Sequence, residues 1–392
     1  MPVQSDVVLS VDALMAAARA ETGIEIVDVE AVEPLGALVD SLNAESGLHA
    51  AGRKGMAGKI IRMLSNRLRM QRDFRAHPEI ADQVVDAPIF FCGMGRTGST
   101  KAQKLLAMSG EFNWLSYWRA LNPSLITGDR TESPQARIDD ADEFTRWFDQ
   151  SSPDLKYAHS FETHEPEEES LILEHSLRSP TWLGWAPIDG YLAWLMGQDQ
   201  TAQFRYLRDT LKYLQWQGIA DPDKRWVLKS PLYTGMEPSL LDVFPDARLI
   251  MTHREPARTI PSALRLMELF HKPFTDRLSS TENYLRGQIA GIDAHLAHRA
   301  RPEGLDVLDL DFREITGAPE KMIRRVFDYI GKPLSSEALA RMMRWNDDNP
   351  QHKHGKKHVY ALEDYGLSEA QINEMFAGYR QLMKDRLATA DR

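Results

Sequence analysis

The segment at 93–100, GMGRTGST, carries the clearest chemistry in the sequence. It follows the apolar run 88–92, which predicts a strand, and precedes 101–108, which predicts a helix. A glycine-rich turn in this position points backbone N–H groups toward a phosphate-like anion, and the helix N-terminus adds partial positive charge. The segment therefore predicts an anion-binding loop, with a plain connecting turn as the alternative.

The type of anion depends on one position of this loop. Nucleotide triphosphatases use GxxxxGK[ST], in which the lysine reaches the terminal phosphates and the Ser or Thr binds magnesium. Here Ser99 stands at the lysine position, and Lys101 lies inside the predicted helix, where its side chain should point elsewhere. Arg96 offers a planar, bidentate donor instead. The loop therefore argues against a magnesium triphosphate site.

Two further groups of polar residues follow predicted strands. Arg254 ends the apolar run 247–254, and Ser262 lies in the next predicted helix, so a guanidinium and a hydroxyl can converge on a second phosphate-like group. Lys229, Ser230 and Pro231 end the run 225–231, at the edge where ligand-binding residues of open parallel sheets gather.

These residues together resemble a known family. GMGRTGST, WVLKSPLY, FPDARLIMTHREPARTIPS and HKHGKKH look like four ordered motifs of the sulfotransferases that use 3′-phosphoadenosine 5′-phosphosulfate (PAPS). The motifs are the P-loop, the catalytic-lysine strand, the 3′-phosphate Arg/Ser pair and the C-terminal basic loop. The resemblance runs from about residue 35 to about residue 380. It is strongest to a bacterial group that also resembles tyrosylprotein sulfotransferases.

The resemblance implies a role for each matching residue. Arg254 and Ser262 would bind the 3′-phosphate, and Lys229 would stabilise the oxygen that leaves with the phosphate. The residues matching the 5′-phosphosulfate site are Arg96, Thr97, Gly98, Ser99 and Thr100. The residues matching the loop that covers the nucleotide are Gly355, Lys356 and Lys357.

The general base of the family is often a glutamate, and the acidic run HEPEEE at 164–169 supplies the candidates. Glu168 is the best match and Glu167 the second. An acidic run before an apolar segment also suits a helix N-terminus, so helix capping is the alternative for Glu168.

The chain also departs from the family pattern. Tyr233 stands where a histidine is common, Phe312 stands where a tyrosine is frequent, and position 101 is lysine instead of an apolar residue. None of these changes touches an expected anion ligand. No metal site is expected, because the histidines of HKHGKKH lie beside lysines and lack a set of carboxylate or thiolate partners.

Composition limits the class of protein. The 392 residues carry a net charge of −10, which argues against a general nucleic-acid-binding protein. Cys92 is the single cysteine, which excludes an intrachain disulfide framework and suits a reducing compartment. No stretch approaches the roughly 18 apolar residues of a membrane helix, and the N-terminus does not look like a signal peptide. We therefore expect a cytoplasmic protein.

The strand and helix signals predict an α/β fold, in which a P-loop-type parallel sheet is flanked by helices. Strands are expected at 88–92, 225–231, 247–254 and 305–310, with a crossover helix at 236–243. The predicted parts are a helical N-terminal extension at 1–85, broken near Gly47 and Gly52, and a sulfotransferase domain at 86–392. That domain includes an aromatic-rich helical insertion at 107–226 and a C-terminal basic loop with helices at 335–392.

The predicted activity is metal-free, in-line transfer of a sulfuryl group from PAPS to a hydroxyl. The insertion holds eight of the nine tryptophans, which favours a small or lipidic acceptor bound in an apolar pocket. The net negative charge fits poorly with acidic peptide acceptors. The alternatives are a metal-dependent P-loop nucleotide kinase and a non-catalytic nucleotide-binding protein.

Overall fold

The computed structural model describes residues 8–350 and 360–387, and their strands form one four-stranded parallel sheet in the order β2-β1-β3-β4. The strands are β1 (Ile89–Cys92), β2 (Val227–Lys229), β3 (Arg248–His253) and β4 (Val307–Asp311). Each lies within or beside a run that the sequence analysis identified. The α/β fold with a parallel sheet is therefore confirmed.

The central strand β1 is buried on both faces of the sheet. Its alternate residues contribute to two separate hydrophobic clusters: Phe90 packs in the larger cluster, and Ile89 and Phe91 pack in the smaller one. Helices α4 (Ser99–Ala107), α15 (Pro319–Tyr329) and α16 (Ser336–Asp348) contribute to the smaller cluster. Parallel strands covered on both faces give this nearly continuous apolar sequence.

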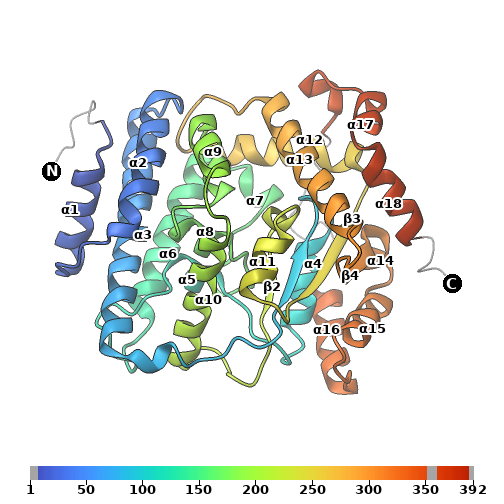
Figure 1. Cartoon of the computed structure of the whole chain (residues 1–392), viewed down its shortest axis with the longest axis horizontal. Helices are drawn as coiled ribbons and strands as arrows, with labels where there is room; N and C mark the ends of the chain where they lie inside the picture. The colour runs from blue at the N-terminus through green and yellow to red at the C-terminus, as the bar shows by residue number, and fades with distance from the viewer. Residues whose placement is uncertain (1–7, 351–359, 388–392) are drawn as a thin grey trace.

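The N-terminal helices α1 (Val11–Thr22), α2 (Val29–Ala44) and α3 (Ala50–Ala76) share the larger cluster with the inserted helices. A buried ion pair between Lys59 of α3 and Glu174 joins the two parts. The helices of the insertion are α5 (Tyr117–Leu121), α6 (Gln135–Ser151), α7 (Leu155–Ala158), α8 (Ser170–His175), α9 (Asp189–Met196) and α10 (Thr201–Trp216). Figure 1 shows these helices between α3 and the sheet. The domain boundary near residue 85 stays a prediction.

Two glycines of the N-terminal part have different positions: one lies between two helices and the other lies inside a helix. Gly47, with φ +62°, lies between α2 and α3, where the break was expected. The expected break at Gly52 is wrong, because α3 continues through it. A Cβ at position 52 would collide with the backbone oxygen of Phe274, so this glycine allows two segments to pack closely.

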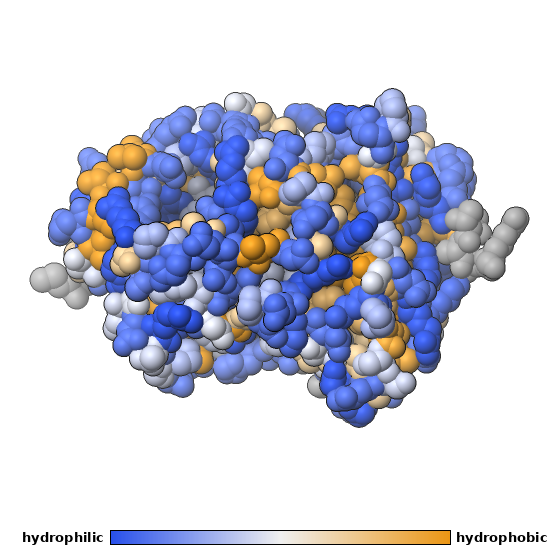
Figure 2. Space-filling view, turned by 60° about the horizontal axis from the view of Figure 1, so that its bottom comes forward, coloured by the Kyte–Doolittle hydropathy of each residue, from blue (hydrophilic) through white to orange (hydrophobic). Residues whose placement is uncertain are grey.

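The remaining helices complete the cover of the sheet. The crossover α11 (Glu237–Val243) connects β2 to β3, as predicted. The others are α12 (Pro256–His271), α13 (Thr281–Arg299), α14 (Phe312–Gly317), α17 (Glu369–Met375) and α18 (Ala377–Leu387). Figure 2 shows a largely hydrophilic face with separate apolar patches. Among the described residues, no helix is both long and apolar enough to cross a bilayer.

Candidate functional site

The predicted anion-binding loop connects β1 to α4. Three of its residues have left-handed backbone angles: Gly93 at φ +113°, Arg96 at φ +68° and Gly98 at φ +89°. A Cβ on Gly93 would lie 2.5 Å from the backbone oxygen of Thr252, so glycine lets the loop pass close to β3. The sequence thus builds a tight turn that ends at the N-terminus of α4.

The hydroxyl of Thr97 is engaged inside this loop. Thr97 is buried, and its Oγ1 lies 2.8 Å from the backbone oxygen of Met94 and 2.7 Å from Oγ1 of Thr252. Any ligand contact from Thr97 would therefore come from its main chain. Ser99 is partly buried and Thr100 is exposed in the first turn of α4.

Arg96 contacts both Arg254 and Ser262, the two residues that the sequence analysis expected to converge on one anion. Arg96 Nε donates to Ser262 Oγ at 3.0 Å, and Arg254 Nη1 donates to the backbone oxygen of Arg96 at 3.0 Å. The Arg254 guanidinium lies 4.0 Å from the ring centroid of Phe312, so this ring supports it without needing a hydroxyl.

The two guanidiniums form no ion pair with the described part of the chain. Burial lowers the pKa of Arg96. Burial also lowers the pKa of Arg254, and the positive charge of Arg96 adds to that effect. The carboxylate of Glu168 acts on Arg96 through its charge but forms no ion pair with it. Two neighbouring guanidiniums without a paired carboxylate among the described residues are arranged to receive an anion with more than one charge.

Lys229 lies on the other side of the loop. The pairing of Phe91 with Lys229 places it on the strand next to β1. Its side chain is only 3% exposed and forms an ion pair with Glu168, whose side chain is 22% exposed. Ser170 Oγ donates to the second oxygen of Glu168 at 2.9 Å. A buried ammonium and a more accessible carboxylate therefore lie together at the end of β2.

The comparison with known families covers the residues that form this site. The sequence profile of the Sulfotransferase family matches residues 88–336, which include the loop, the acidic run, Lys229 and the Arg254–Ser262 pair. The chain belongs to this family.

Its relatives among bacterial proteins are also sulfotransferases. The chain is 23% identical over 293 residues to omega-hydroxy-beta-dihydromenaquinone-9 sulfotransferase Stf3 of Mycobacterium tuberculosis, covering 70% of each protein. The crystal structure of sulfotransferase STF9 from Mycobacterium avium has a TM-score of 0.83 and 25% identity, covering 97% of this chain and 98% of that one. The crystal structure of STF1 from M. tuberculosis has a TM-score of 0.78 and 26% identity, covering 95% and 99%.

In this sulfotransferase, Glu167 is held more tightly than Glu168. Its Oε1 accepts the Glu168 N–H at 2.8 Å, and its Oε2 lies 3.3 Å from His159 Nε2. Burial alone would raise the pKa of Glu167, but His159, Lys229 and the accepted hydrogen bond together lower it to about 2. A carboxylate with so low a pKa is a weak proton acceptor.

The sequence analysis missed two members of the site and noted a third only as a departure. His159 has no motif around it, and its contact with Glu167 depends on folding. Glu169 is fully buried and accepts the Lys229 N–H at 2.8 Å. Tyr233 donates its hydroxyl to the same carboxylate. The continuous acidic run was the one signal that could have identified Glu169.

The predicted basic loop with Gly355, Lys356 and Lys357 lies outside the described residues. Within the two described ranges, no cluster of three or more His, Cys, Asp or Glu side chains is arranged to hold a metal ion.

Proposed function

We propose that this sulfotransferase moves a sulfuryl group from PAPS to a hydroxyl of a small or lipidic acceptor. The observation that carries the donor assignment is the pair of guanidiniums of Arg96 and Arg254, which form no ion pair among the described residues and lie at a glycine-rich loop. PAPS carries anionic groups at both its 5′ and its 3′ positions. A donor with two separated anionic groups fits two arginines better than ATP does, because the phosphates of ATP form one chain at the 5′ position.

The donor fits the residues present. The loop amides and Arg96 would hold the 5′-phosphosulfate, and Arg254 with Ser262 would hold the 3′-phosphate. Ser262 Oγ already accepts a hydrogen bond from Arg96, so one hydroxyl connects the two halves of the site. PAPS supplies the activated sulfuryl group when it is bound.

Lys229 and Glu168 would act directly on the reacting groups. Lys229 places a positive charge where negative charge grows on the leaving oxygen, and such pre-positioned charge is a main source of rate in group transfer. Glu168 is the most exposed of the three consecutive glutamates at 167–169, and it would take the proton of the acceptor hydroxyl. The low pKa of Glu167 makes that residue the weaker candidate for the base.

The acceptor site would lie beside the acidic turn. The His159 ring centroid lies 5.0 Å from that of Phe161 and 5.8 Å from that of Phe270, and all three residues are partly exposed. An apolar acceptor with a terminal hydroxyl suits such an aromatic surface. The similarity to Stf3, which acts on a hydroxylated menaquinone, supports a lipidic acceptor.

The tryptophans contribute less to this surface than the sequence suggested. Most of those in the insertion are buried in the core, while three are partly exposed. The buried ones are Trp118, Trp182, Trp185, Trp216 and Trp226. We therefore assign the acceptor to the surface around His159 and not to the tryptophan-rich layer as a whole. The buried free thiol of Cys92 suits a reducing compartment such as the cytoplasm.

Calorimetric titration with 3′,5′-bisphosphorylated adenosine and with ATP tests the donor. We expect the bisphosphate to bind more tightly, with or without magnesium, because ATP has no 3′-phosphate for Arg254. Equal affinity for the two ligands would contradict the proposal. Binding of ATP alone, with a requirement for magnesium, would support the kinase alternative. Tight bisphosphate binding without any sulfuryl transfer would support the non-catalytic alternative.

A further inference from the structure

We propose that Glu169 is a positioning residue which, with Tyr233, fixes the end of β2 against the acidic turn and so sets how Lys229 and Glu168 face the bound donor. The inference rests on the proposed sulfuryl transfer. It concerns two fully buried side chains, whose mutual hydrogen bond lies behind the proposed catalytic pair.

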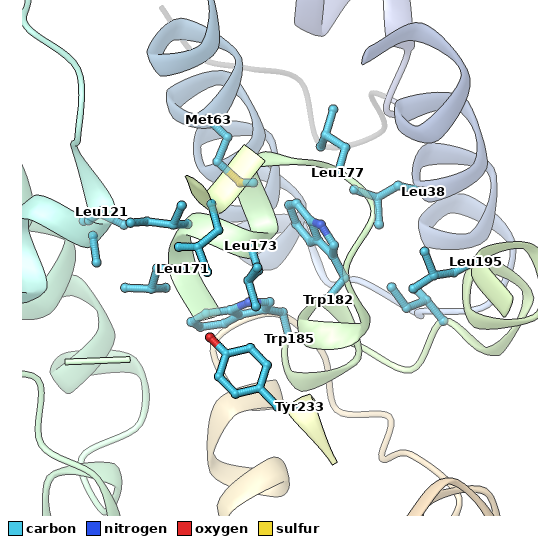
Figure 3. Packing of buried hydrophobic residues seen from close by; sticks show 14 of the residues in the cluster. Leu38, Met63, Leu121, Leu171, Leu173, Leu177, Trp182, Trp185, Leu195 and Tyr233 are labelled. Carbon is cyan, nitrogen blue, oxygen red and sulfur yellow. The ribbon is translucent and has the colours of Figure 1, made fainter. Parts of the chain in front are cut away.

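The contacts of Glu169 join two parts of the site. Its Oε2 accepts the Lys229 N–H at 2.8 Å, and its Oε1 accepts the hydroxyl of Tyr233 in the 3-10 turn η3 (Pro231–Tyr233). Figure 3 shows the Tyr233 hydroxyl pointing toward the helix that carries Leu171 and Leu173. Glu169 thus binds the residue that carries the ammonium, while its neighbour Glu168 binds the ammonium itself.

A second contact reinforces the same junction. Ser170 Oγ lies 3.1 Å from Ser230 Oγ. Ser170 directly follows Glu169, and Ser230 directly follows Lys229, so the two contacts are consecutive along both segments. Consecutive contacts fix the separation and the register of two chain segments. Glu169 therefore limits the positions from which Lys229 can reach the donor.

The same carboxyl can change its charge near neutral pH. Burial raises the pKa of Glu169 to about 7, although the hydrogen bonds from Tyr233 and from the Lys229 N–H oppose this shift. Above that pH the carboxylate is ionised, and both of its hydrogen bonds become charge-assisted and stronger. The titratable groups around it are Glu167, Glu168, Lys229, Tyr233 and Cys92.

The central experiment measures kcat against pH for Glu169→Gln, with an alkyl alcohol acceptor that does not itself titrate in this range. The wild-type kcat should rise as the pH passes through about 7, because ionised Glu169 holds Lys229 more firmly. In Glu169→Gln this rise should disappear, and kcat at pH 8 should fall roughly 10–100-fold, as when supporting groups of other active sites are removed. Affinity for 3′,5′-bisphosphorylated adenosine should change less than about threefold, because the arginines are untouched.

Tyr233→Phe gives an independent test if Glu169→Gln fails to fold. Removing the hydroxyl removes a hydrogen bond that lowers the pKa of Glu169, so the rise in kcat should move to higher pH. A rise that stays at the wild-type pH in Tyr233→Phe would overturn the proposal. If folded Glu169→Gln still showed the rise in kcat near pH 7, the proposal would also be overturned.

The chain offers a matched control for each variant. Glu174 is another buried glutamate of α8, paired with Lys59 and Trp185 away from Lys229. Tyr213 donates to buried Asp73 at 2.5 Å, which makes it a second tyrosine–carboxylate pair. Glu174→Gln and Tyr213→Phe should lower the thermal unfolding temperature and leave the pH profile unchanged. If the wild-type protein transfers no sulfuryl group at all, the proposed function fails. If Glu169→Gln and Tyr233→Phe are active and keep the wild-type pH profile, only the positioning role fails.

Discussion

The two sides of the site differ in whether their positive charges are paired with an acidic side chain. On the loop side, Arg96 and Arg254 lie next to each other and form no ion pair among the described residues. On the β2 side, the ammonium of Lys229 is neutralised by Glu168. The loop side is ready to receive an anion, whereas the β2 side is stable without one.

Lys229→Ala should produce the largest effect on the β2 side. Its positive charge meets negative charge that grows mainly in the transition state, so we expect kcat to fall about 10²–10³-fold. Binding of 3′,5′-bisphosphorylated adenosine, measured by calorimetry, should change little. Lys101→Ala removes a lysine near the same loop and should leave kcat close to wild type. A collapse of nucleotide binding with a normal single-turnover rate would make Lys229 a ground-state ligand instead.

Glu168→Gln tests whether the carboxylate paired with Lys229 is the base. With an alkyl alcohol acceptor, we expect kcat to fall about 10²-fold, because the hydroxyl needs a proton acceptor. An acidic phenol is partly ionised already and should lose less activity. Glu165→Gln, which changes the glutamate paired with Lys104 at 3.6 Å, is the control. The structure does not bear out helix capping by Glu168, because the N-cap residue of α8 is Glu169 and no side chain caps this helix. Equal losses with both acceptors would limit Glu168 to its ion pair with Lys229.

Arg254→Ala tests the loop side. The variant loses a charge-assisted contact of about 1.5–3 kcal/mol, so affinity for the bisphosphate should fall roughly 10–150-fold. Arg258, one turn farther along and exposed, provides the control, and Arg258→Ala should weaken binding less than about threefold. Similar losses in the two variants would mean that a general positive field, and not a specific contact, binds the 3′-phosphate.

Glu167→Gln should have the smallest effect on catalysis and a visible effect on stability. The pKa of Glu167 falls from 4.5 to about 2 on folding, so its contribution is present above pH 4.5 and is lost as the pH drops through about 2. Denaturant titrations should show a loss of up to about 3 kcal/mol in the free energy of unfolding at pH 7. The difference from wild type should shrink toward pH 2. A constant difference across this range would mean that packing, and not charge, explains the loss.

The sequence predicted the features that depend on neighbouring residues. The strand, glycine turn and helix at 88–108 follow from local periodicity and from the freedom of glycine at positive φ. Arg254 and Ser262 both reach Arg96 because one directly follows β3 and the other lies in the first turns of the following helix.

The sequence could not predict how the acidic run contacts β2. Glu168 and Lys229 are 61 residues apart, and the contacts between the start of α8 and the end of β2 bring them together. Three consecutive glutamates have identical chemistry, yet Glu167, Glu168 and Glu169 have three different environments. Burial and hydrogen bonding separate their roles, and both are properties of the folded chain. The same limit applies to the tryptophans, whose number gave no measure of how many lie in the core.

Transfer of labelled sulfate from PAPS to acceptors tests the central claim most directly. The panel should contain a long-chain alcohol, a hydroxylated isoprenoid quinol, a simple phenol and an acidic tyrosine peptide, each with and without a metal chelator. We predict labelled sulfate ester on the long-chain alcohol or the quinol, at a rate that the chelator does not change and that Lys229→Ala lowers about 10²–10³-fold. Transfer only to the acidic peptide would contradict the proposed acceptor. No transfer from PAPS, together with magnesium-dependent phosphoryl transfer from ATP, would contradict the proposed function itself.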